Sequence, residues 1–274
     1  MSSGQRAEVL GRLRKEPRRN LLLLDLVEGT NAGAGDAGAA QIVVARGGDE
    51  IIGIASLRPS LILETSIDPE GLAAALPLLS SLEAGLIKSQ AQSVALVWES
   101  LRSRGRRPLL DRFEECHVLD CETAGKGLPV LPQGARLRRA NPEDMEALVF
   151  AARSSLREED RPDPFDGDRN GFRHWVRGRM PRARILEVAG RPVFVAYVDV
   201  RRPEGWLIQG VYTWPEQRRR GYAHAGMAGL IDEAIAGGAE HVQLAVVEGN
   251  RPALGLYEGL GFNALSRLRT ILFH

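Results

Sequence analysis

The sequence predicts an α/β fold in which helices pack on a mixed sheet, an α+β arrangement. In the second half of the chain, apolar runs typical of strands alternate with segments of helical periodicity. The first half shows a similar succession. Between them, residues 122–134 contain three glycines and two prolines without periodicity, which is typical of a linker. We therefore expect an N-terminal domain over residues 1–121, a linker over 122–134 and a C-terminal domain over 135–274.

The second half opens with a clear helix start. Asn141 is a natural N-cap, Pro142 suits the first helical position, and Glu143 and Asp144 place acids in the first turn. This helix is expected to end near Ser155. Further along we expect a loop over 157–171, helices over 172–179, 224–236 and 253–259, a hairpin from 184–188 and 193–200, and strands over 206–213, 242–247 and 265–273.

The first half is interpreted as a degenerate copy of the same pattern. Residues 42–57 predict a hairpin, and residues 32–40, almost all Gly and Ala, predict a loop before it. An unrelated α/β domain remains the alternative. The remaining expected elements are helices over 72–86 and 98–103 and strands over 93–97 and 115–119.

Composition excludes several functional classes. A formal net charge of +1 argues against a general nucleic-acid binder, and the apolar run from Leu21 to Leu24 is far short of the ~20 residues that a membrane span requires. The N-terminal arginines are interrupted by Glu8 and Glu16, which favours a solvated helix face over a transit peptide. Cys116 and Cys121 lack the spacing of a zinc site. We expect no metal, no membrane partner, no nucleic acid and a reducing, cytoplasmic setting.

A basic loop precedes the predicted helix over 224–236. A turn that enters a helix offers unpaired backbone N–H groups and the positive end of the helix dipole, so it favours a bound anion. Gly221 allows the backbone to approach a phosphate closely, and Ala223 is small. No Gly-Lys-Ser/Thr follows, which excludes a nucleotide-triphosphatase loop. A merely solvated helix start is the alternative for this segment, Arg218-Arg219-Arg220-Gly221-Tyr222-Ala223-His224.

Two further segments accompany the loop. Val211-Tyr212-Thr213 ends the extended segment before it, and Asn250 begins the short helix that follows the next strand. Tyr257 lies seven residues after Asn250, close to two helical turns, so both fall on one helix face. Leu260-Gly261-Phe262 closes the pattern.

In this order and spacing, these segments resemble the Gcn5-related N-acetyltransferase (GNAT) family. The resemblance covers residues 137–273 and is strongest over 206–262. The run Tyr212-Thr213-Trp214-Pro215-Glu216 is also similar to glycine N-acyltransferase-like (FR47-like) proteins and bacterial two-domain acetyltransferases, which pair a degenerate first copy with an active second one. Arg219 departs from the family pattern, where a small residue, often Gly, is common.

The resemblance implies a GNAT fold in the second half and an enzyme that transfers the acetyl group of acetyl-CoA to a primary amine. Attack is direct and passes through a tetrahedral intermediate, because no cysteine lies in the motif region. The resemblance implies Tyr257 as the acid that protonates the departing thiolate and a Val211 amide that polarises the thioester carbonyl. The implied cofactor-binding residues are Val211, Tyr212, Thr213, Arg218, Arg219, Arg220, Gly221, Tyr222, Ala223, His224 and Asn250.

Several alternatives stay open. A CoA-binding regulatory module without turnover and an acyltransferase for longer acyl-CoA both fit the same motifs, and the chain is compatible with a homodimer. The acids between Glu158 and Asp168 suggest an acceptor that is a cationic amine. His174 and His224 are weaker candidates for the general base than the carboxylates, which are Glu158, Glu159, Asp160, Glu187 and Asp199.

Overall fold

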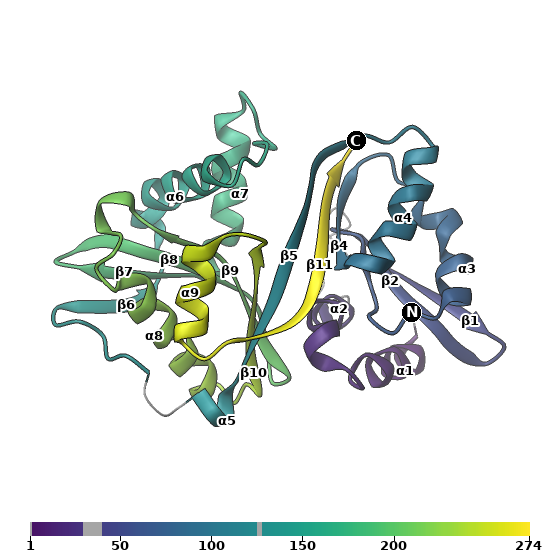
Figure 1. The fold of residues 1–274 in the computed structure, drawn as a ribbon, viewed down its shortest axis with the longest axis horizontal. Helices are drawn as coiled ribbons and strands as arrows, with labels where there is room; N and C mark the ends of the chain where they lie inside the picture. Colours follow the sequence, from purple (N-terminus) through teal and green to yellow (C-terminus); the bar gives the residue numbers. More distant parts are fainter. Residues whose placement is uncertain (1, 30–39, 125–127) are drawn as a thin grey trace. The chain divides into compact units, whose positions relative to one another are not determined.

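A computed structural model describes residues 2–29, 40–124 and 128–274 (Figure 1). The chain forms two compact units. The first unit comprises the chain up to Cys116 together with Val246–Gly249 and Ala264–His274, and the second comprises His117–Ala245 and Asn250–Asn263. These bounds differ from the expected domains 1–121 and 135–274, because the last strand of the chain pairs within the first unit. Part of the expected loop over 32–40 and residues 125–127 of the expected linker lie outside the described residues.

The first unit opens with two helices. Its β1 and β2 form an antiparallel hairpin, as expected for residues 42–57, and β3 pairs with β2. Asp68 caps α3 by accepting the Glu70 N–H at 2.9 Å. The elements are α1 (Ser3–Leu13), α2 (Pro17–Gly29), β1 (Gln41–Gly47), β2 (Glu50–Arg58), β3 (Ile62–Leu63), α3 (Pro69–Leu79), β4 (Gly85–Gln90), α4 (Ala91–Ser103) and β5 (Pro108–Asp120).

Two expectations for this unit were wrong. The helix expected over 72–86 ends at Leu79, and its last two residues already belong to β4. The strand expected over 93–97 lies inside α4. An apolar run of five residues fits a helix as well as a strand. Over a longer stretch, buried residues recur with the helical period, at Val94, Val97, Trp98 and Leu101.

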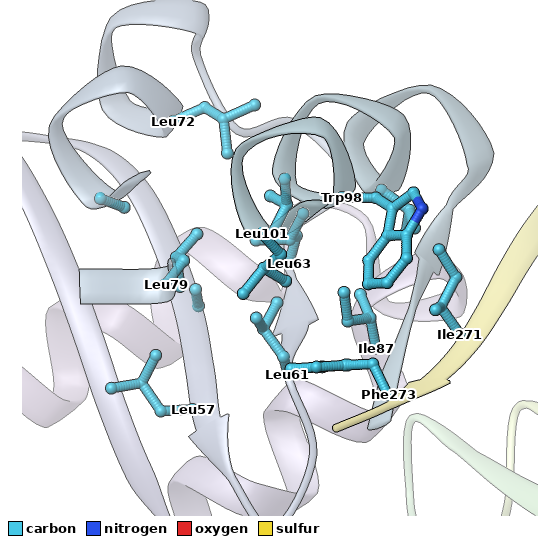
Figure 2. Close-up of a cluster of buried hydrophobic side chains, with 14 residues drawn as sticks. Leu57, Leu61, Leu63, Leu72, Leu79, Ile87, Trp98, Leu101, Ile271 and Phe273 are labelled. Atoms are coloured by element: carbon cyan, nitrogen blue, oxygen red, sulfur yellow. The ribbon is translucent and has the colours of Figure 1, made fainter. Parts of the chain in front are cut away.

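The core of the first unit lies between α3, α4 and the strands β2–β4 (Figure 2). Trp98 of α4 packs against Phe273, with ring centroids 5.9 Å apart, and Ile271 lies in the same cluster. Both Ile271 and Phe273 come from β11 (Asn263–Phe273), which pairs with β4 in antiparallel register from Leu268↔Gln90 to Phe273↔Gly85. The end of the chain therefore supplies core residues to the first unit.

The second unit contains the predicted motifs. Asn141 caps the opening turn with a capping box to Asp144, as the sequence predicts, and the following helix ends at Glu158. The elements are α5 (Cys121–Ala124), β6 (Ala135–Arg139), η1 (Pro142–Asp144), α6 (Met145–Glu158), α7 (Arg169–Arg179), η2 (Met180–Arg182), β7 (Ala183–Val188), β8 (Arg191–Arg202), β9 (Gly205–Thr213), η3 (Pro215–Gln217), α8 (Tyr222–Ala236), β10 (His241–Val247) and α9 (Arg251–Gly259).

Strands β10-β9-β8-β7-β6 are neighbours in this order, with β10 parallel to β9 and the other pairs antiparallel. Alternate side chains of β8 face opposite sides of the sheet. Val195 joins the cluster formed with Leu148 of α6 and Val176 of α7, whereas Phe194 faces Gly226 of α8. Helices α6 and α7 thus cover one face of the sheet and α8 covers the other.

The two halves of the chain repeat one order of elements. After its first two helices, each half continues with a hairpin, a strand, a helix, a strand, a helix and a strand. This is the order from α1 to β5 and again, apart from short turns, from α6 to β11. The third strand differs most, because β3 has two residues where β9 has nine. In the described part of the chain, no helix is long and apolar enough to cross a membrane.

Candidate active site

The end of β9 carries a bulge. The register between β8 and β9 shifts between Val195 and Tyr197, and Gly210 on the opposite strand has φ +58°. A Cβ built on Gly210 would lie 2.9 Å from the ring of Tyr197, so only glycine fits both the conformation and the space. A bulge re-aims the residues that follow it, here Val211 to Thr213. The sequence contained a signal for it, a lone glycine inside a β-rich run.

β9 also parts from β10. Within the described residues, the parallel pairing of these strands comprises only Val242↔Trp206 and Gln243↔Leu207. Beyond Leu207, the edge of β9 that faces β10 has no ladder partner, although its other edge stays paired with β8 through Tyr212 and Thr213. An extended ligand can pair with such a free backbone edge as an added strand would.

The loop after β9 leads into α8 through two left-handed residues. Arg219 has φ +59° and Gly221 has φ +79°. Glycine is the usual residue in this conformation, which side chains such as that of Arg219 rarely adopt. Gly221 is the N-cap of α8 and provides no side-chain cap, and a Cβ at this position would meet nothing within 4 Å. The first N–H groups of α8 are therefore open to an anion.

Arg218 connects this loop with the end of α6. Its Nε donates to the Thr213 carbonyl at 3.0 Å, and its Nη2 contacts both carboxylate oxygens of Glu158 at 2.7 and 2.8 Å. The guanidinium carbon lies 5.5 Å from the ring centre of Tyr212. The Nη1 atom of Arg220 makes a longer contact of 3.4 Å with the side-chain oxygen of Gln217. Glu158 was expected as a candidate base, and its role here is an ion pair.

Close contacts fix the start of α8. A Cβ on Gly226 would lie 2.5 Å from the ring of Phe194, so the helix approaches β8 as closely as backbone allows. His224, in the first turn, has its Nε2 3.8 Å from where a Cβ on Gly259 of α9 would lie. The start of α8 and the end of α9 are thus neighbours.

Asn250 and Tyr257 sit at the two ends of α9. The Asn250 side chain accepts the Ala253 N–H at 3.2 Å, so it caps this helix as expected. Tyr257 is buried and packs against Phe262, with ring centroids 5.8 Å apart. Burial raises the pKa of the Tyr257 hydroxyl well above its ordinary value, and the carboxylate of Glu159 acts in the same direction. The phenol therefore stays protonated and able to donate at neutral pH.

Tyr212 points into the core between the sheet and α6. It is buried beside Trp214, with ring centroids 5.6 Å apart, and Trp214 stacks on Phe150 of α6. The Tyr212 hydroxyl is buried and has no hydrogen-bond partner among the residues that the structure describes. Tyr212 can thus contact a ligand on the β10 side of β9 only through its backbone.

The other candidate bases are dispersed. Glu187 on β7 pairs with Arg138 at 2.7 Å, and Asp199 on β8 pairs with Arg179 at 2.9 Å. Glu159 lies 3.9 Å from Arg161. His174 is exposed on α7. The structure thus keeps these carboxylates in ion pairs and singles out none of them as a base.

The geometry fits the pyrophosphate and pantetheine arm of a CoA thioester. The uncapped start of α8, the left-handed Arg219 and Gly221, and the free edge of β9 are consecutive in the chain. The corresponding helix of the first unit differs, because the carboxylate of Asp68 already occupies its N-cap. In the described segments, no group of three or more His, Cys, Asp or Glu side chains could hold a metal ion.

The fold and the open helix start define a class of acyl-CoA-dependent transferases. Residues 146–262 match the model of the acetyltransferase (GNAT) family. The match contains the basic loop, Asn250 and Tyr257, so the resemblance predicted from the sequence is confirmed. Comparison with curated proteins gives no significant match.

Solved structures extend the likeness to the whole chain. A Drosophila protein superposes with a TM-score of 0.74 at 18% identity, covering 99% of this chain and 97% of its own. A GCN5-related N-acetyltransferase from Sphaerobacter thermophilus gives 0.58 at 17% identity, covering 89% and 84%. A tandem GNAT protein from the clavulanic acid biosynthesis pathway gives 0.54 at 16% identity, covering 90% and 86%. At these identities the likeness concerns the fold, and it confirms the expected GNAT-like copy in the first half.

Proposed function

We propose that this chain is an N-acetyltransferase that moves the acetyl group of acetyl-CoA to a primary amine. The observation that carries the proposal is the uncapped, left-handed entry into α8, directly after a strand that leaves its neighbour. The N–H groups of residues 219–224 and the side chains of Arg218 and Arg220 hold the pyrophosphate. Asn250 contacts the pantetheine arm beside the free edge of β9.

The reaction is assigned to a direct attack of the amine on the thioester carbonyl. The Val211 N–H, re-aimed by the bulge at Gly210, polarises the carbonyl and stabilises the oxyanion of the tetrahedral intermediate. Tyr257 donates its proton to the departing thiolate, and its raised pKa keeps that proton available. No acyl-enzyme is needed, because both cysteines lie outside the matched segment and are buried.

The first half is proposed to bind no CoA. The carboxylate of Asp68 already accepts an N–H group of α3 at the position where a phosphate would bind in α8. It would also repel the phosphate charge. The expected division of labour, a supporting first copy and an active second copy, follows from this difference.

Calorimetry with acetyl-CoA tests the proposal. Gly221→Glu places bulk and negative charge in the phosphate loop, so wild-type binding in the micromolar range should be lost in this variant. Gly238→Glu is the matched control, because Gly238 follows the other end of α8 with φ +74° and equally open space. Equal binding by all three proteins, or no binding by the wild type, would refute the cofactor site.

A further inference from the structure

A half-buried arginine, Arg179 at the end of α7, lies beside the bulge of β9. Its Nη2 would be 3.9 Å from a Cβ on Gly210, the residue before Val211. The guanidinium carbon lies 4.2 Å from the ring centre of Tyr197 and 5.1 Å from that of Trp175, and Nη2 donates to Asp199 at 2.9 Å. Two aromatic rings and a carboxylate thus hold this cation in one orientation.

Arg179 retains donors for another group. The Arg179 side chain is 23% exposed, and its hydrogen bond to Asp199 uses Nη2. Within the residues that the structure describes, Nε and Nη1 have no acceptor. A guanidinium held by its neighbours loses little side-chain entropy when it binds a planar anion, which favours this use of the free donors.

The surroundings of Arg179 carry an excess of positive charge. Asp199 is shared with Arg182, whose Nη1 lies 3.6 Å away. Two guanidinium groups, those of Arg179 and Arg182, therefore share one carboxylate, and a negatively charged ligand would balance the excess charge.

Three of the acids that suggested a cationic acceptor have local partners. Glu158 binds Arg218, Asp163 accepts the Phe165 N–H at 2.9 Å, and Asp168 accepts the Gly171 N–H at 2.8 Å. These carboxylates stabilise the loop and the start of α7.

We infer that Arg179 selects an acceptor amine that carries an anionic group, a carboxylate or a phosphate. The inference rests on the proposed acetyl transfer at Val211, because Arg179 can position an acceptor only if the transfer takes place beside Gly210. The anion binds the free Nε and Nη1 donors, and the amine then lies near the thioester carbonyl. Arg179 acts on the acceptor's charged group and takes no part in bond making.

Matched pairs of acceptors test this inference. Each pair differs in charge alone: an amino acid and its amide, or an aminoalkyl phosphate and the corresponding amino alcohol. Thiol release from acetyl-CoA should give the charged member of at least one pair a kcat/KM at least tenfold above its neutral partner. The pair that shows the difference identifies the anion. Equal rates, or a preference for the neutral members in both pairs, would overturn the inference.

Variants then assign the preference to Arg179. Arg179→Met should lower kcat/KM for the charged acceptor roughly ten- to hundredfold through KM, the usual effect of losing a charge-assisted hydrogen bond. It should leave the neutral acceptor unchanged. Arg179→Lys should restore part of the preference, because it keeps the charge without the planar donors. The exposed Arg177, on the same helix, is the matched control as Arg177→Met.

A double variant and a binding measurement separate the role of Arg179 from structural damage and from loss of acetyl-CoA binding. Because Arg179→Met leaves Asp199 without its main partner, the double variant Arg179→Met/Asp199→Asn removes both charges and should show the same loss of preference. Acetyl-CoA binding is measured for every variant by calorimetry. A wild type that does not bind acetyl-CoA refutes the proposed function. Normal binding with unchanged charge preference in both variants refutes the role of Arg179 alone.

Discussion

At the scale of single residues, backbone conformation decides where chemistry can occur. Gly210, Arg219 and Gly221 all have positive φ and lie within twelve positions of one another. Left-handed conformation costs a non-glycine residue roughly 1–2 kcal/mol, so Arg219 is held there by its surroundings. Such strain concentrates at functional segments, and here it shapes the β9 bulge and the entry into α8.

Tyr257 is the residue whose chemistry can be tested most directly. Tyr257→Phe removes the proton donor while keeping the buried ring, so kcat should fall about 10²–10⁴-fold, the range of general acid catalysis. Acetyl-CoA affinity should stay within about threefold, because the ring contact with Phe262 remains. Thiol-release kinetics and calorimetry measure the two quantities. An unchanged kcat would remove Tyr257 from the mechanism and favour a protein without this acid step.

The pH profile provides an independent check on the same residue. Burial raises the pKa of Tyr257, so the acid form persists through the pH range where an ordinary tyrosine ionises. We therefore expect that kcat does not decline as the pH rises to about 10, the pKa of an unperturbed tyrosine. A decline in kcat between pH 8 and 9 that disappears in Tyr257→Phe would contradict the raised pKa.

The sequence predicted local caps and turns better than contacts between distant residues. Asn250 and Gly221 hold the expected positions because a helix cap and a left-handed turn are local features. Arg179 and Asp199 could not be paired from sequence, since their contact joins α7 to β8 across twenty residues. The ion pair of Arg218 with Glu158 spans sixty. Charged residues at such separations give no periodic signal.

At the scale of elements, β4 and β5 of the first unit share a buried acid. Glu114 is buried and contacts Lys88 at 2.5 Å and Arg112 at 2.8 Å. Burial alone would raise its pKa, but the two cations and their hydrogen bonds outweigh burial and lower the pKa to about 2. Glu114 therefore stays ionised down to strongly acidic pH in the folded protein.

This acid should make stability depend on pH. The folded pKa lies below the unfolded one, so the contribution is fully present above about pH 4.5 and is lost as pH falls towards about 2. Glu114→Gln should lower the free energy of unfolding by about 3 kcal/mol at pH 7, because two half-buried cations lose their buried counter-charge. Urea unfolding at pH 7, 4 and 3 measures both effects.

The control for Glu114 is an exposed pair in the same unit. Glu99 contacts Arg102 one helical turn away, and both side chains are about two-thirds exposed. Glu99→Gln should change the free energy of unfolding by less than about 0.5 kcal/mol, as is usual for surface pairs. Equal effects of the two substitutions, or a Glu114→Gln variant that keeps the full acid sensitivity of the wild type, would contradict the buried-acid account.

Helices and strands were predicted correctly where a periodic pattern extended over many residues. The hairpins β1–β2 and β7–β8 and the helices α6, α8 and α9 fall where the pattern placed them. The short run over 93–97 was assigned to a strand because five apolar and small residues fit either period. The pairing of β11 with β4 could not be predicted from local sequence, because the paired residues are more than 170 positions apart in the chain.

At the scale of the whole molecule, part of the last strand of each half of the chain belongs to the other unit. The end of β5, residues 117–120, belongs to the second unit, and residues 264–274 belong to the first. Strand β11 brings Ile271 and Phe273 into the first unit's core and pairs with β4 through six residue pairs. A fragment that begins or ends within residues 122–134 would therefore lack residues that belong to its own unit.

The isolated second half, residues 135–274, should consequently fail to fold alone. It lacks residues 117–120, and its β11 presents an unpaired apolar strand, a hazard for aggregation. Gel filtration and circular dichroism should show aggregated or partly unfolded protein, without acetyl-CoA binding. A full-length chain cleaved at a protease site inserted at Val130, which is 89% exposed, contains every strand and should retain binding. A monomeric, folded 135–274 fragment with wild-type affinity would show that the exchanged strands are dispensable and that the expected domain is autonomous.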